Sequence, residues 1–147
     1  MSDEEVKSKI PSRVQLAGCI IQNPEGKILL IHRNTPKRAQ WEVPGGKIGD
    51  HIPSEKPEEA VLREVKEELG IEIKILGKAG EHEFSEDGYT MDYAWYNATI
   101  ISGEPQPMEK SHDKVGYFSW EELRAMKEEL SINLRNLVDV YFAGELN

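Results

Sequence analysis

The 147-residue chain has a mass of 16.7 kDa, is 38% hydrophobic and 31% charged, and fits one domain with one hydrophobic core over residues 1–147. It has no apolar run near the roughly eighteen residues of a membrane-spanning helix, and its first ten residues lack the apolar centre of a secretory signal, so we expect a cytoplasmic protein with no membrane partner. The net charge of −9 argues against a nucleic-acid polymer as partner, because such binders need a basic surface that releases counterions.

The first third of the chain is predicted to form strands. Residues 14–21 and 27–33 are rich in Val, Ile and Leu, and the turn-forming cluster Asn23-Pro24-Glu25-Gly26 separates them. This pattern predicts a β-hairpin. Residues 41–43 are predicted as a short strand that ends at Pro44-Gly45-Gly46.

Residues 57–69 give the clearest helix prediction. Pro57 suits the first turn, the other residues tolerate or favour helix, and Gly70 stands where a C-cap favours glycine. Strands are then predicted at 71–76, 79–84, 91–101 and 114–120, a short helix at 121–127, and a last helix capped by Ser131. This order predicts an α/β fold with a mixed sheet.

Acidic side chains cluster on the clearest helix. Glu64, Glu67 and Glu68 are spaced three and four apart, so they share one face, on an arc of roughly 100°. The apolar positions form a separate stripe that can pack on a sheet: Val61, Leu62, Val65 and Leu69. Such a face is either an ordinary solvated surface or, because neighbouring carboxylates repel, a site for a hard divalent cation.

The residues from Gly46 to Ile71 resemble the signature of the Nudix hydrolases. The signature begins with a glycine, five further residues and a glutamate. Seven residues later comes its second half, Arg-Glu-aliphatic-x-Glu-Glu-x-Gly-aliphatic. Here Glu55 is followed at that spacing by Arg63-Glu-Val-Lys-Glu-Glu-Leu-Gly-Ile71. The preceding Trp41-Glu-Val-Pro-Gly-Gly-Lys47 resembles the segment that leads into the motif in the same family. The resemblance implies a Nudix α/β/α sandwich with a mixed central sheet.

The first half of the motif departs from the family pattern. In most members the second glycine of the Gly-Gly pair precedes the first motif glutamate by six positions. Here Gly46 precedes Glu55 by nine, so the loop is three residues longer than usual. Gly49 has the expected spacing to Glu55 but is not part of a glycine pair. The family often has a glutamate three residues after the second glycine of the pair. Here the alternatives are that Asp50 or His51 takes its place, or that no residue does.

The resemblance implies a catalytic set of Arg63, Glu64 and Glu67. Glu67 and Glu68 would bind a metal ion, Mg²⁺ with Mn²⁺ as a substitute, and the backbone carbonyl of Gly46 would be another ligand. Glu64 would be a further ligand or the base for the attacking water. Arg63 would position a glutamate through its planar guanidinium. An ordinary surface ion pair is the alternative for Arg63.

Other residues are assigned to the site less directly. Glu55 could bind metal or support the start of the helix, and Glu109 and Asp113 lie in a later segment that often supplies one more carboxylate. Arg33, Lys47 and Tyr89 are candidates for substrate binding, although Tyr89 is equally explained as a strand-end aromatic. His51, His82 and His112 show no metal-ligand spacing among themselves, which argues against zinc.

The activity implied by the resemblance is hydrolysis of a phosphoanhydride bond in a nucleoside diphosphate linked to another group. A MutT-like nucleoside triphosphate pyrophosphohydrolase is the preferred form. ADP-ribose, nucleotide sugars and dinucleoside polyphosphates are alternative substrates. A nucleotide-sensing module without turnover is an alternative of another class. Many members of the family dimerise, so a homodimer is also among the expectations.

Overall fold

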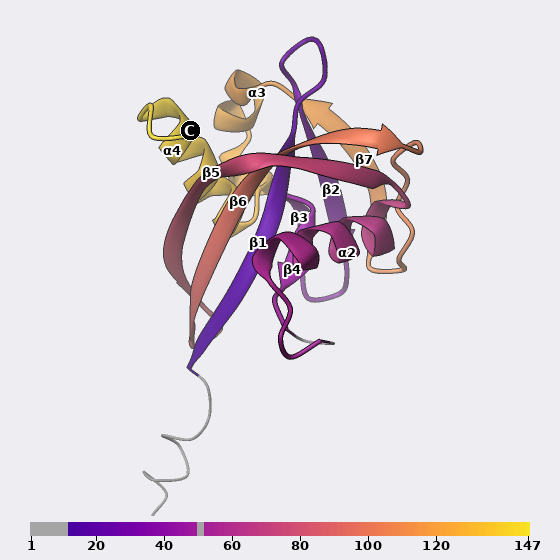
Figure 1. Ribbon diagram of the computed structural model, residues 1–147. Helices are drawn as coiled ribbons and strands as arrows, with labels where there is room; N and C mark the ends of the chain where they lie inside the picture. Colours follow the sequence, from indigo (N-terminus) through magenta and orange to yellow (C-terminus); the bar gives the residue numbers. More distant parts are fainter. Residues whose placement is uncertain (1–11, 50–51) are drawn as a thin grey trace, which may run out of the picture.

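The first sheet of the computed structural model, which describes residues 12–49 and 52–147, has four strands in the order β4-β1-β6-β5 (Figure 1). These are β1 (Arg13–Ile21), β4 (Gly45–Lys47), β5 (Glu72–Glu86) and β6 (Tyr89–Ser102). β1 runs parallel to β6 and antiparallel to β4, while β5 and β6 are antiparallel. The predicted mixed sheet is confirmed.

The second sheet is antiparallel, in the order β3-β2-β7, and consists of β2 (Ile28–Asn34), β3 (Ala39–Glu42) and β7 (His112–Phe118). The predicted hairpin of residues 14–21 and 27–33 is therefore wrong as a paired ladder. Its turn does form, because Asn23 Oδ1 accepts from the N–H groups of Glu25 and Lys27. Beyond the single bridge between Gln22 and Ile28, however, β1 and β2 enter different sheets.

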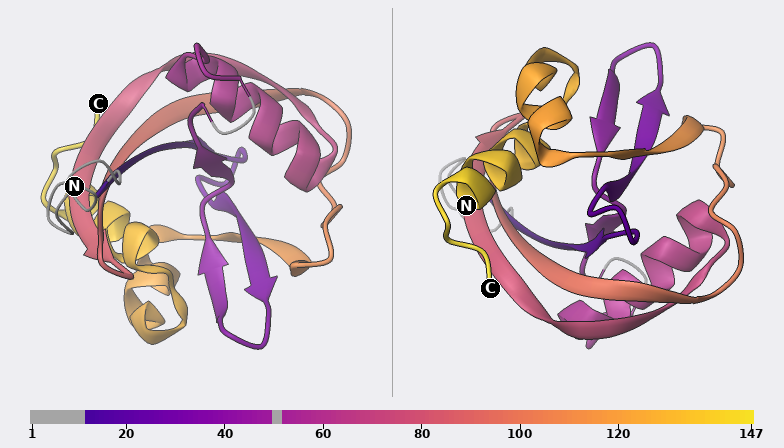
Figure 2. Two further views of the ribbon diagram at one scale, coloured as in Figure 1. Left: turned by 90° about the horizontal axis from the view of Figure 1, so that it is seen from below. Right: turned by 90° about the horizontal axis from the view of Figure 1, so that it is seen from above.

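Successive side chains of β1 and β2 enter two different cores. Ala17 and Cys19 pack with the helix α2 (Pro57–Leu69), whereas Ile20 packs with α3 (Trp120–Ala125) and α4 (Ile132–Phe142). This follows from the two-residue period of a strand, which points neighbouring side chains to opposite faces. Figure 2 shows α2 and α4 on opposite sides of the strands. The predicted α/β/α sandwich is confirmed.

The helix α2 has the predicted bounds. Pro57 is its first residue, and Gly70 ends it in the left-handed conformation at φ 69°, with its N–H donating to the Lys66 carbonyl. Val61, Val65 and Leu69 are fully buried. The apolar stripe is thus fixed against the strands, which determines where the acidic face points.

Two predictions for the later part of the chain need comment. The predicted strands 71–76 and 79–84 are one strand, β5, whose pairing with β6 shifts register at several points, so the glycines near position 77 mark bulges and not a break. Ser131 caps α4 as predicted, because its side chain accepts from the Leu134 N–H at 3.1 Å. No helix among the described residues combines the length and apolar character needed to cross a bilayer.

Candidate active site

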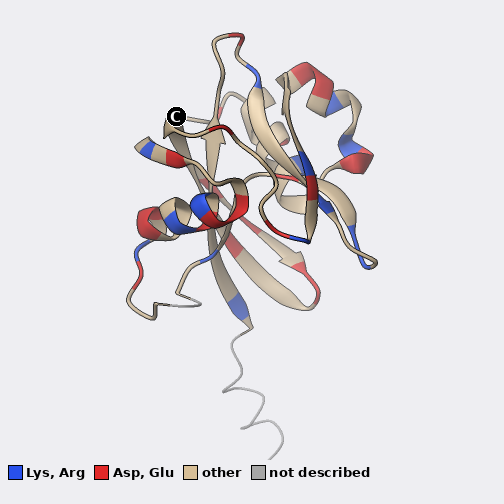
Figure 3. Cartoon of the chain, turned by 90° about the vertical axis from the view of Figure 1, so that its right-hand side faces the viewer, with Lys and Arg blue, Asp and Glu red and all other residues tan. Residues whose placement is uncertain are grey.

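The acidic face of α2 lies against the short strand β4. A methyl group on Gly46 would be 2.6 Å from the carboxyl carbon of Glu64, so the backbone of Gly46 lies directly against that carboxylate. The neighbouring Gly45 N–H donates to Glu68 Oε1 at 2.8 Å. Two of the predicted glutamates therefore meet the glycine pair that the sequence analysis placed beside them. Figure 3 shows acidic and basic positions interleaved along this helix.

Arg63 connects three of the glutamates. Its Nε and Nη2 donate to the two oxygens of Glu55 at 2.8 and 3.0 Å, and its Nη1 lies 3.0 Å from Glu64 Oε1 and 3.4 Å from Glu67 Oε2. The Glu55 side chain is only 1% exposed and also accepts from the Gly49 N–H. The two-point contact with Glu55 fixes the guanidinium, which in turn orients Glu64. The contacts hold the Arg63 guanidinium in one orientation beside Glu55 and Glu64.

Burial perturbs the acid–base properties of two glutamates. It raises the pKa of Glu68 well above its usual value, and the Gly45 N–H opposes this only in part. It also raises the pKa of Glu64, against the opposing effect of Arg63. Both shifts mean that negative charge here is poorly compensated by the protein alone. Carboxylate oxygens are the ligands that hard divalent cations prefer, so Glu64 and Glu68 fit such an ion.

A second group of side chains lies on the far side of Glu68. His112 Nε2 is 3.9 Å from Glu68 Oε2 and 3.6 Å from Glu42 Oε1. Burial would raise the pKa of Glu42, but polar contacts with His112, Arg33 and Gln40 outweigh it and hold the pKa at about 2. One ligand atom from each of Glu68, Glu109 and His112 lies within 4.8 Å of the others.

Glu42 and His112 lie beside the predicted glutamates, although the sequence does not predict either of them there. The nearest ionisable side chains to His112 in space are carboxylates and not other histidines. Glu42 falls in the predicted strand of residues 41–43. A signal for Glu42 exists in the hairpin of β2 and β3, where Arg33 on β2 pairs with Glu42 on β3.

The remaining predicted residues fall in different places. Glu67 is on the exposed edge of the cluster, its side chain 45% exposed. Asp113 does not join the glutamates, because its carboxylate contacts His32 Nδ1 at 2.7 Å and Asn34 Nδ2 at 3.1 Å. The His32 contact lowers the pKa of Asp113. The two suggested replacements for the missing motif glutamate, residues 50 and 51, lie outside the described residues.

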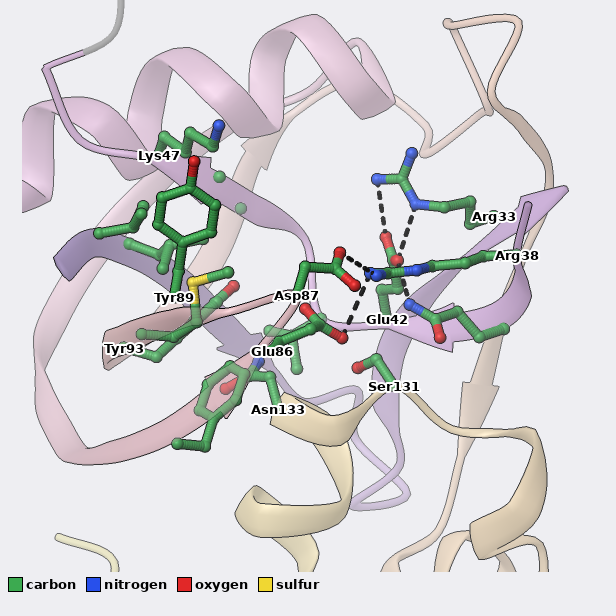
Figure 4. A pocket seen from close by; sticks show the side chains of 18 of the residues that line it. Arg33, Arg38, Glu42, Lys47, Glu86, Asp87, Tyr89, Tyr93, Ser131 and Asn133 are labelled. Carbon is green, nitrogen blue, oxygen red and sulfur yellow. Dashed lines mark hydrogen bonds and ion pairs between the residues drawn. The ribbon is translucent and has the colours of Figure 1, made fainter. Parts of the chain in front are cut away.

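A cavity of about 710 Å³ opens beside β4 (Figure 4). Its lining includes Gly45 and Gly46, so the cavity reaches β4, the strand that contacts Glu64 and Glu68. All three predicted substrate-binding residues line it: Arg33, Lys47 and Tyr89. Apolar and aromatic side chains form much of the wall, namely Val14, Leu16, Phe84, Met91 and Tyr93.

Charged residues surround one side of the cavity. Arg33 makes a two-point contact with Glu42, at 2.8 and 3.1 Å. Arg38 pairs with Glu86 at the end of β5 and with Asp87 in the turn that follows, as Figure 4 shows. The first pair joins β2 to β3, and the Arg38 pairs link the loop between these strands to the end of β5 and the following turn. They place guanidinium groups where an anionic ligand could compete for them.

One polar side chain of the cavity has a fixed orientation. The Asn133 Oδ1 accepts from the Trp95 indole N–H at 3.1 Å, and an indole nitrogen can only donate. The amide oxygen of Asn133 is therefore engaged with Trp95. Both residues are buried, at 8% and 0% exposure.

Comparison with known proteins gives consistent results. A family profile described as NUDIX domain matches residues 13–141. The CTP pyrophosphohydrolase of Escherichia coli is 33% identical over 102 residues, which cover 65% of this chain and 73% of that protein. A MutT NUDIX hydrolase of Burkholderia pseudomallei is 30% identical and superimposes with a TM-score of 0.73 over 86% of this chain and 96% of its own. A MutT protein of Methanosarcina mazei reaches a TM-score of 0.79 at 24% identity, over 92% of this chain and 96% of its own, and this likeness concerns the fold alone.

Proposed function

The chain belongs to the Nudix hydrolases, and on that premise we propose that it cleaves a nucleoside triphosphate into the monophosphate and pyrophosphate. Nudix hydrolases act on phosphoanhydride bonds of nucleotides and need a divalent metal ion. The choice of a triphosphate is supported by the likeness to the CTP pyrophosphohydrolase of Escherichia coli.

The observation that carries the proposal is the position of the 710 Å³ cavity beside the glycines that contact the glutamates. Its volume is within the usual range of about 300–1,000 Å³ for small-molecule sites. An apolar and aromatic wall suits a nucleobase, which can stack on Tyr89 or Phe84. The phosphates of such a ligand would then extend past Lys47 toward α2.

The cationic side chains suit a polyphosphate. Lys47 lines the cavity on β4, next to Gly45 and Gly46, and Arg33 lines it on β2. Arginine binds phosphate through paired N–H groups, and lysine through a compact charge. Arg33 would have to share its guanidinium between Glu42 and the ligand, because both Nε and Nη2 now donate to Glu42.

We assign the proton-transfer role to Glu64. Its carboxyl is partly buried, and its raised pKa brings it closer to neutral pH, where a general base is most effective. In the proposed reaction Glu64 takes a proton from water, the water oxygen bonds to phosphorus, and the P–O bond to the leaving phosphate group breaks. Arg63 holds Glu64 in place.

The divalent ion, for which we propose Mg²⁺ with Mn²⁺ as a substitute, neutralises the phosphate charge and activates water when it is bound. The residues assigned to hold it are Glu67, Glu68 and the Gly46 carbonyl. The buried Glu68 carboxylate, raised in pKa by desolvation, supports this assignment because a nearby cation would favour its ionised form.

The proposal is tested by a turnover screen with Mg²⁺ and with Mn²⁺. Substrates would include the cytidine and other nucleoside triphosphates, oxidised guanosine triphosphates, ADP-ribose, nucleotide sugars and dinucleoside polyphosphates. Release of pyrophosphate and monophosphate from one triphosphate class is expected. Reaction in ¹⁸O-labelled water then shows which phosphorus is attacked, because the label enters either the monophosphate or pyrophosphate.

Glu67→Gln is the matched control, because Glu67 is exposed and its loss should leave the fold intact. It is expected to lower kcat by at least about a hundredfold. Faster turnover of ADP-ribose, a nucleotide sugar or a dinucleoside polyphosphate would replace the triphosphate proposal. Nucleotide binding without turnover of any substrate would favour a sensing module instead.

A further inference from the structure

His112 is buried without a hydrogen bond to its Nε2. The side chain is 1% exposed at the start of β7, and Nε2 is one of two buried side-chain polar atoms without a hydrogen-bond partner among the described residues. The nearest carboxylate oxygens, of Glu42 and Glu68, are 3.6 and 3.9 Å away, which is too far for a hydrogen bond. Buried polar atoms are rarely left unpaired, so another group is expected to face this nitrogen.

The spacing around His112 matches that of ligands around one ion. Two ligand atoms at about 2.1 Å from an ion lie roughly 3.0 Å apart at a right angle and about 4.2 Å apart when opposite. The separation of 3.9 Å between Nε2 and Glu68 Oε2 falls within this range. One ligand atom from each of Glu68, Glu109 and His112 lies within 4.8 Å of the others, so the half-exposed Glu109 side chain would have to shift slightly to reach the same ion.

The second ring nitrogen of His112 has a different environment. Nδ1 is 3.4 Å from Ser111 Oγ and 3.9 Å from Glu109 Oε1. A metal-binding histidine usually donates its other N–H to an oxygen of this kind, which fixes the ring and its tautomer. With Nδ1 as the donor, Nε2 can present a lone pair to an ion, in place of the N–H that faces Glu42 when no ion is bound.

Charge compensation also differs between the carboxylates near His112. Glu42 is neutralised by the two-point contact with Arg33 and accepts a further hydrogen bond from Gln40. Glu68 accepts a hydrogen bond from the Gly45 N–H, and no Arg or Lys side chain among the described residues pairs with it. An ion between Glu68 and His112 would supply the missing positive charge.

We propose that His112 Nε2 binds a divalent transition-metal ion together with the carboxylates of Glu68 and Glu109. The inference deepens the proposed function, on which it rests in part, because Glu68 is also assigned to the catalytic ion. Mg²⁺ strongly prefers oxygen ligands, whereas an imidazole nitrogen suits transition metals. The mixed nitrogen and oxygen set is therefore expected to favour Mn²⁺ over Mg²⁺.

The test is pulsed electron paramagnetic resonance on the full chain loaded with one equivalent of Mn²⁺. A directly bound imidazole gives nitrogen modulation of the electron spin echo, which changes when histidine is labelled with ¹⁵N. The wild-type protein is expected to show it. His112→Gln should abolish the modulation, while His82→Gln, which removes a histidine that stacks near Trp95, should keep it.

Mn²⁺ and Mg²⁺ affinities provide a second readout. His112→Gln should weaken Mn²⁺ binding at least about tenfold and change Mg²⁺ binding less, whereas Glu109→Gln, which removes an oxygen ligand, should weaken the binding of both ions. Bound Mn²⁺ without nitrogen modulation in the wild-type protein would overturn the inference even if nucleotides are hydrolysed. Nitrogen modulation that depends on His112 would support it even if no nucleotide is turned over, so the two proposals fail separately.

Discussion

Arg63→Ala is expected to lower the free energy of unfolding by about 3 kcal/mol, because it removes the guanidinium that neutralises the buried Glu55 carboxylate. The Glu55 side chain is 1% exposed and takes two Arg63 N–H groups, at 2.8 and 3.0 Å. Removing one partner of a buried pair costs about 3–5 kcal/mol. The Gly49 N–H still donates to Glu55, which places the expected loss at the lower end.

Urea denaturation of the variant, with metal chelated and with excess Mg²⁺, measures this loss. Arg63→Lys keeps the charge but not the planar fork, so it should lose about half as much. Lys66→Ala is the matched control on the same helix, because its ion pair with Glu72 is exposed and should contribute under about 1 kcal/mol. Equal stability of Arg63→Ala and the control would refute the reasoning.

Three further results are expected. Gly46→Ala should lower kcat about a hundredfold, because its methyl group would be 2.6 Å from the carboxyl carbon of Glu64 and would displace that side chain. Gly77→Ala is the control, because its methyl group would meet no atom within 4 Å, and it should leave kcat unchanged. Equal kcat values for the two variants would contradict the placement of Glu64. Glu42→Gln should lower the free energy of unfolding by about 3 kcal/mol at pH 7, because the pKa of Glu42 is about 2 in the folded protein instead of 4.5. This stabilisation is complete above pH 4.5 and is lost as the pH falls toward 2. Acid unfolding of the variant that matches that of the wild type would contradict this. Tyr89→Ala should raise KM about tenfold with kcat little changed, as expected for lost stacking on a base, and an effect confined to kcat would count against a base in this cavity.

The helix α2 and the placement of its acidic residues on one face were predictable because their signals are local. Pro57, Gly70 and the apolar stripe fix the bounds of α2 by capping and periodicity alone. The acidic face then follows from residue spacing. The separation of β1 and β2 into two sheets was not predictable in this way. Both strands carry apolar residues on each face, so their pattern does not specify which neighbour each one pairs with.

The candidate site was only partly predictable, because part of it depends on which strands pair with each other. Glu64, Glu68 and Gly46 come together through one strand and one helix that lie close in sequence. His112, by contrast, reaches Glu68 through the pairing of β7 with β2, two strands that lie far apart in sequence. Asp113, the next residue, points to His32 instead, since adjacent strand residues face opposite sides. No spacing rule within the sequence distinguishes these two neighbours.

The parallel pairing of β1 with β6 has a consequence for the order of folding. It places Arg13 opposite Thr90, across more than half of the chain, and closing so long a loop is slow. β4 attaches to the other edge of β1, with Ala17 opposite Gly46. We therefore expect α2 to form early and the ability to bind a cation to develop with the slowest refolding phase, which stopped-flow circular dichroism and a metal-sensitive fluorophore can separate. Simultaneous signals would contradict this order.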